Sequence, residues 1–87
     1  MSITSNTQED TMKSVMISLD SISKVKSFVN DVNRLDGEFD LVSGRYIVDA
    51  KSIMGIFSLD LSRPIELQIH TESDSESVLK KLKPYLV

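Results

Sequence analysis

Hydrophobic and polar positions alternate in two separate stretches of the chain, residues 12–19 and 64–70, which is the period of a β-strand. In the second stretch Pro64 occupies the first position, where a strand needs no backbone donor. Both stretches therefore predict strands with one apolar face. The apolar positions that share that face are Val15, Ile17 and Leu19 in the first strand and Ile65, Leu67 and Ile69 in the second.

Residues 38–49 contain two further short runs of strand-forming residues on either side of Ser43 and Gly44. This arrangement predicts a β-hairpin with those two residues as its loop. The resulting register collects four apolar side chains on one face and leaves the charged ones on the other. The predicted pairs on the apolar face are Leu41 with Tyr46 and Phe39 with Val48.

Helical periodicity appears in three other segments, each preceded by a serine of the kind that caps a helix. Ser21 precedes the first helix, which ends at the turn of residues 36–37; Ser52 precedes a second helix of about two to three turns within residues 53–61. Ser73 and Glu76 form a capping box before a third. The residues of their apolar faces are Ile22, Val25, Phe28, Val29 and Val32, then Ile53, Ile56 and Phe57, then Val78, Leu79, Leu82, Tyr85 and Leu86.

The element order is therefore β-α-β-β-α-β-α. Because each strand has one apolar face, the order predicts an α+β fold in which helices cover one side of a single antiparallel sheet. The length allows one domain, residues 11–87. We expect residues 1–10, which are polar and lack periodicity, to form a disordered leader.

The segment 53–61 is more apolar than a short amphipathic helix requires. Met54, Leu59 and Leu61 lie at a wide angle from its main apolar stripe. Either these side chains reach under a neighbouring loop, or an apolar patch stays exposed, and such a patch often marks a partner site. Gly55 costs about 1 kcal/mol relative to alanine inside a helix, which indicates that another element packs closely there.

Composition narrows the class of function. The net charge of −3 and the scattered basic residues argue against nucleic acid as a partner. The chain has no cysteine, which excludes disulfides and thiolate metal sites, and it has no apolar run near the ~18 residues of a membrane span. We therefore expect a cytoplasmic protein that has no cofactor or metal site and does not bind membranes.

Candidate catalytic groups are few. The only histidine, His70, ends the predicted strand on its polar side, and an ordinary surface role is the simplest interpretation. The acidic residues show no calcium-loop or zinc-site spacing, and no glycine-rich phosphate loop is present. Ser52 is explained as a helix cap, although a phosphate there would meet the positive end of the helix and Lys51.

The stretch "KSIMGIFSLDLSRPIELQI", residues 51–69, resembles HPr, the phosphocarrier family of the bacterial sugar phosphotransferase system. "KSIMG" followed by "SL" is similar to the regulatory-serine helix of the Gram-positive members. The resemblance implies an open-faced β-sandwich with strand order 1-4-2-3, three helices on one face of the sheet, and a monomer. It also implies a non-enzymatic protein.

The family carries phosphate on a histidine at the start of the first helix, close to an arginine. Carried over without a gap from Ser52, the histidine position falls on Ser21 and the arginine position on Ser23, with Lys24 where a proline usually follows. A phosphoserine ester does not pass its phosphate on readily. The resemblance therefore implies a member that lacks the phosphoacceptor histidine, and His70 lies on a different element.

The resemblance also carries a second family function. Ser52 matches the serine that an ATP-dependent HPr kinase/phosphorylase modifies, after which a transcriptional regulator binds. We expect a regulatory or adaptor protein whose partners are that kinase, such a regulator or another phosphotransferase-system component. The expected partner surface consists of Lys24, Lys51, Ile53, Met54 and Phe57.

Two alternatives remain at this point. A ferredoxin-like module has the same β-α-β-β-α-β order with a different strand sequence across its sheet, and it would be a dimer that senses a small ligand. A true phosphocarrier using Ser21 or His70 is the other.

Overall fold

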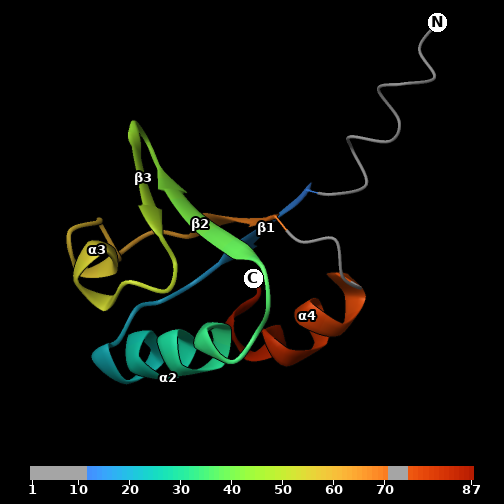
Figure 1. Cartoon of the computed structure of the whole chain (residues 1–87). Coiled ribbons are helices and arrows are strands. Elements are labelled where there is room, and N and C mark those ends of the chain that lie inside the picture. The colour runs from blue at the N-terminus through green and yellow to red at the C-terminus, as the bar shows by residue number, and fades with distance from the viewer. Residues whose placement is uncertain (1–11, 71–74) are drawn as a thin grey trace, which may run out of the picture.

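The computed structural model describes residues 12–70 and 75–87, so the expected leader at residues 1–10 lies outside the described part. Figure 1 shows a sheet with helices below it and a hairpin of two strands rising at one side. The elements in chain order are β1 Met12–Ile17, α2 Ile22–Asn33, β2 Glu38–Ser43, β3 Tyr46–Asp49, α3 Ile53–Phe57, β4 Ile65–His70, α4 Ser75–Lys81 and a 3₁₀ turn, η1, at Lys83–Tyr85.

The four strands form one antiparallel sheet in the order β1-β4-β2-β3. This confirms the predicted α+β class, the strand order and the three helices. The ferredoxin-like alternative, which requires a different strand order, is wrong.

Strand β4 lies at the centre of the packing because β1 and β2 pair with its two edges. Its predicted alternation is confirmed: Ile65, Leu67 and Ile69 are buried, while the side chains between them are half-buried on the open face. Residues from all three helices complete the core. The helical contributors to the buried cluster are Val25, Phe28, Val32, Ile56 and Val78, and Leu82 joins them directly after α4.

The hairpin differs from the prediction by one residue in its loop. Gly44 and Arg45 form the loop, and Ser43 pairs with Tyr46. Gly44 has a φ of 61°, as in a type II′ turn, which needs glycine at its first central position. Leu41 therefore pairs with Val48 rather than with Tyr46. The tyrosine faces the tip of the hairpin, beyond the reach of the core, and its side chain is exposed.

The helices also correct three expectations. Helix α3 has five residues, which is shorter than the two to three turns predicted, because the helix ends at its C-cap, Ser58. Ile22 is 63% exposed rather than core-facing, since it stands in the first turn of α2. The last helix stops at Lys81, because Pro84 supplies no backbone donor, and the chain continues as η1. Ser73 lies outside the described residues, so the capping box stays a prediction.

The C-terminal residues attach to α2 through one aromatic side chain. The rings of Tyr85 and Phe28 meet edge to face, with their centroids 5.3 Å apart. The Tyr85 hydroxyl donates to Asp31 Oδ2 at 2.8 Å. Burial raises the pKa of Tyr85, and the hydrogen bond to the Asp31 carboxylate raises it further, while a hydrogen bond with Ser27 lowers it.

We expect Tyr85→Phe to lower the free energy of unfolding by about 1 kcal/mol, because Asp31 loses its donor. The folded-state pKa of Tyr85 lies above its unfolded value of about 10. Its contribution to stability is therefore complete below that pH and declines as the pH rises through the folded pKa. Urea unfolding at neutral and alkaline pH should show a smaller alkaline loss for Tyr85→Phe than for wild type. Equal losses would contradict this assignment.

Candidate functional site

The start of α2 presents two serines and a lysine. Ser21 caps the helix from an extended backbone conformation, with φ −144° and ψ 157°, and its Oγ accepts from the backbone N–H of Lys24 at 3.1 Å. The predicted cap is confirmed. Ser23 is exposed on the first turn. The ammonium of Lys24 lies 3.3 Å from Asp20 Oδ1, so its charge is already paired.

Ser52 occupies the same structural position at α3. Its backbone is extended, with φ −105° and ψ 108°, and its Oγ accepts from the backbone N–H of Gly55 at 3.2 Å. The residue is exposed, so the hydroxyl is a cap that a modifying enzyme can reach. Both interpretations of Ser52, cap and modification site, are compatible with this geometry.

Gly55 allows α3 to lie close to the sheet. A Cβ at this position would stand 3.2 Å from Val48 Cβ and 3.4 Å from Ser52 Oγ, closer than most side chains pack. Val48 belongs to β3 and faces the core side of the sheet, beside Leu41. The close approach predicted from the cost of this glycine is thus present, and it holds α3 beneath β3.

The apolar width of α3 divides between core and surface. Ile56 is buried and Ile53 is half-buried, whereas Met54 is 77% exposed and Phe57 is 42% exposed. We call Ile53, Met54 and Phe57 the α3 apolar surface. Of the two alternatives for this segment, the exposed patch is therefore the one present. Leu59 and Leu61 follow α3 in the chain; Leu59 is buried, and Leu61 is half-buried against the core.

Helices α2 and α3 pack against each other, and Figure 1 shows α3 above the first half of α2. The exposed Ile22 in the first turn of α2 is an apolar surface residue that the sequence interpretation missed, because its helical spacing matched the core face. Its position as the first residue of the helix, directly after the cap, was the sequence feature that could have indicated its exposure.

Lys51 is more strongly held than a surface lysine. Its ammonium donates to the carbonyl oxygens of Leu35 at 3.0 Å and Gly37 at 3.1 Å, and it lies 5.5 Å from the centre of the Phe39 ring. These contacts fix the loop after α2. Lys51 therefore has a structural function in addition to the partner contact predicted for it, and its charge is not directed at Ser52.

His70 lies at the end of β4, on the open face of the sheet. Its Nε2 is 3.3 Å from Asp40 Oδ2. The helices cover the opposite face, so the structure does not bring His70 together with Ser21. Among the described residues, no cluster of three or more histidine and acidic side chains could hold a metal ion.

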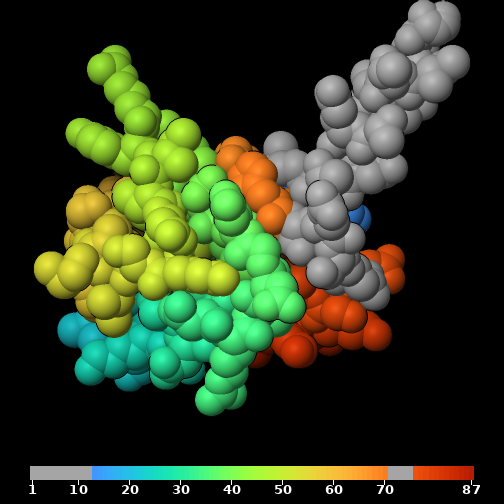
Figure 2. Space-filling model, viewed as in Figure 1, coloured from blue at the N-terminus to red at the C-terminus, as the bar shows by residue number. Residues whose placement is uncertain are grey.

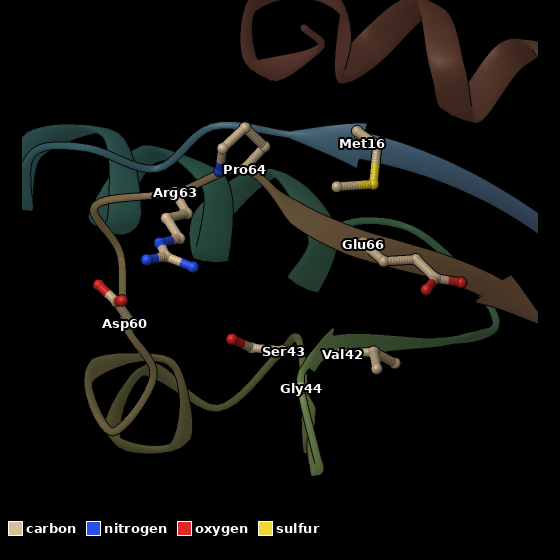
Figure 3. A pocket seen from close by; sticks show the side chains of 8 residues that line it. All are labelled: Met16, Val42, Ser43, Gly44, Asp60, Arg63, Pro64 and Glu66. Carbon is tan, nitrogen blue, oxygen red and sulfur yellow. The ribbon is translucent and has the colours of Figure 1, made fainter.

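A groove of about 450 Å³ lies on the open side of the sheet, between the hairpin and the loop before β4 (Figure 3). Asp60 at its rim accepts from the hydroxyl of Ser62 at 2.6 Å and from its backbone N–H at 3.1 Å, and these bonds lower the pKa of the carboxyl. None of the candidate serines, Ser21, Ser23 and Ser52, lines this groove. Its lining residues are Met16, Val42, Ser43, Gly44, Asp60, Arg63, Pro64 and Glu66.

Comparison with known proteins gives a consistent result at the level of structure. No protein-family model and no curated protein matches the chain. The fold is similar to the phosphocarrier protein HPr from Bacillus anthracis, with 31% identity, coverage of 87% of this chain and 95% of that one, and a TM-score of 0.69. It is also similar to HPr-C-His from Thermoanaerobacter tengcongensis, with 25% identity, coverage of 84% and 86%, and a TM-score of 0.63. Within the described residues, no helix is both long enough and apolar enough to cross a membrane.

We expect Ser52→Ala to lower the free energy of unfolding by about 1 kcal/mol, because the N–H of Gly55 loses its acceptor. Ser52→Asp should stay close to wild type, since a carboxylate can accept the same bond. Thermal and urea unfolding of the two variants measures the difference. If Ser52→Asp were as unstable as Ser52→Ala, the hydrogen bond at the cap would not be the stabilising feature.

Proposed function

The chain belongs to the HPr family, and on that premise we propose that it is a regulatory or adaptor protein related to the phosphotransferase system and not a phosphohistidine carrier. The observation that carries the proposal is the structure around Ser52. An exposed serine hydroxyl caps a short helix whose next turn presents the α3 apolar surface. A modification site and a surface for a protein partner therefore adjoin each other.

The residues at the start of α2 support the proposal that the protein is not a phosphohistidine carrier. Ser21 is the N-cap of α2. In the ungapped carry-over from Ser52, it falls on the position of the family's phosphohistidine, and Ser23 falls on the arginine position. A serine phosphate is a stable ester, unlike a phosphoimidazole. His70 is on the far side of the sheet, next to Asp40, and so offers no substitute at this helix.

The surroundings of Ser52 favour a phosphate that is recognised by another molecule. The cation nearest in sequence, Lys51, donates to two carbonyl oxygens. The carboxylate of Asp49 accepts from the backbone N–H of Lys51 at 2.9 Å. The phosphate would consequently keep most of its charge, and a partner's arginines or lysines would supply the neutralising contacts.

In this proposal an HPr kinase/phosphorylase transfers the γ-phosphoryl group of ATP to Ser52 Oγ, releasing ADP and the hydroxyl proton. The phosphorylated protein then binds a transcriptional regulator or another phosphotransferase-system component. The α3 apolar surface, together with Lys24 on α2, forms the remaining contact. The function is placed in the bacterial cytoplasm, where ATP and the kinase are available.

We expect ATP and an HPr kinase/phosphorylase to add one phosphoryl group, and fragmentation of the product to locate it on Ser52. Intact-mass spectrometry measures the addition. Ser52→Ala should remain unmodified, whereas Ser21→Ala, which removes the equivalent cap of α2, should be modified like wild type. If a genuine HPr is fully modified in parallel and this protein is not, Ser52 is only a helix cap.

Met54→Asp should weaken binding of the phosphorylated protein to its regulator by about tenfold or more, because a charge replaces the most exposed apolar side chain of α3. The free energy of unfolding should change by less than about 0.5 kcal/mol, since the side chain contributes little to the core. Met16→Asp is the matched control, because Met16 is also exposed but lies on β1. Titration calorimetry compares the three proteins, and equal binding by all of them would remove α3 from the interface.

A further inference from the structure

The two edge strands of the sheet, β1 and β3, differ in whether another segment of the chain covers them. At β1 the C-terminal residues cover the edge: Val87 N–H donates to the Met16 carbonyl at 3.2 Å, and Ser18 N–H donates to the Tyr85 carbonyl at 2.8 Å. Leu86 pairs with Ile17 in an isolated bridge. At the opposite edge, β3 has no further strand beside it within the described residues. Exposed edges offer unpaired backbone groups to another strand.

The backbone groups that β3 turns outward follow from its pairing with β2. Ala50 N–H donates to the Phe39 carbonyl at 2.8 Å, and in an antiparallel ladder alternate residues point the same way. The backbone groups of Tyr46, Val48 and Ala50 therefore face β2, so within β3 the outward groups belong to Ile47 and Asp49, and Arg45 lies in the turn just before the strand. Asp49 confirms the alternation, because its carbonyl accepts from Ser52 N–H at 3.0 Å, away from β2.

This edge is accessible and apolar. Ile47 is 65% exposed and Tyr46 is 70% exposed. Helix α3 does not cover the edge, because Gly55 packs against Val48 on the core side of the sheet. In Figure 2 the hairpin projects from the body of the molecule. An exposed isoleucine with outward-facing backbone groups is the usual feature of a strand that pairs with another chain.

We propose that β3 pairs with β3 of a second copy of this chain, antiparallel, about a two-fold axis at Ile47. The two Ile47 residues then exchange both of their N–H to C=O bonds and meet side by side on the open face. The joined sheets have eight strands. A two-fold interface requires a self-complementary surface, and the charges of Arg45, in the turn before β3, and of Asp49, the last residue of β3, meet that requirement.

The register follows from those charges. With Ile47 opposite Ile47, Arg45 of each copy lies opposite Asp49 of the other, and the dimer gains two ion pairs that flank the apolar pair. A shift by two residues in one direction would place Arg45 opposite Lys51, and a shift in the other would place it opposite Ile47. Only the central register pairs both charges. On the core side, Tyr46 of one copy lies over Val48 of the other.

The contact is short, so association should be weak and concentration-dependent, and it should weaken further as salt screens the charges. Sedimentation velocity over a range of concentrations should show a monomer–dimer equilibrium for wild type. Arg45→Asp and Asp49→Arg should each lower the association constant about tenfold, because each turns two attractions into repulsions. An equimolar mixture of the two variants should recover a heterodimer, since both pairs are then attractive.

Two further measurements keep the test independent of the fold of Asp49→Arg. Ile47→Glu should abolish the dimer, whereas Met16→Glu, on the covered edge strand, should leave it unchanged. The exchange rate of the Ile47 amide should fall as the wild-type concentration rises. The proposal is overturned if wild type stays monomeric at every concentration, if both glutamate variants dissociate the dimer equally, or if the mixed charge variants form no heterodimer.

Discussion

The burial of alternate residues in β4 is the constraint on which the rest of the structure depends. This strand pairs on both of its edges, with β1 and with β2, and its three inward isoleucine and leucine side chains are at most 1% exposed. Helices must cover that face, because apolar area of this size is stable only out of water. The positions of α2 and α4 beneath the sheet follow from this requirement.

The placement of α3 depends on a second and smaller constraint. Gly55 lets the helix approach Val48, and Ile56 then enters the core. Once those two residues face the sheet, Met54 has to face solvent, since it lies on the other side of a single turn. The helix is too short to bury a broad stripe. An exposed apolar surface beside Ser52 is therefore a consequence of how α3 is anchored.

Much of the fold could be predicted because its determinants are local. The alternation of β4 and the serine caps of α2 and α3 depend on neighbouring residues only, and the structure has them as expected. The hairpin register could not be fixed by face patterning, because a shift of two residues keeps every side chain on the same face. The positive φ of Gly44 decides it. The contacts of Lys51 with Leu35 and Gly37 join distant residues, and no local pattern indicates them.

Ser21 and Ser52 show why local geometry alone does not assign a function. Both hydroxyls accept from a backbone N–H three residues on, and both residues are exposed. At each serine the neighbouring lysine is engaged elsewhere, Lys24 with Asp20 and Lys51 with two carbonyls. A carrier has to stabilise its phosphate internally until transfer, whereas a signal has to leave the phosphate available to others. Because the nearby cations are occupied, the second role suits both positions better, and only Ser52 leads directly into the α3 apolar surface that a partner could bind.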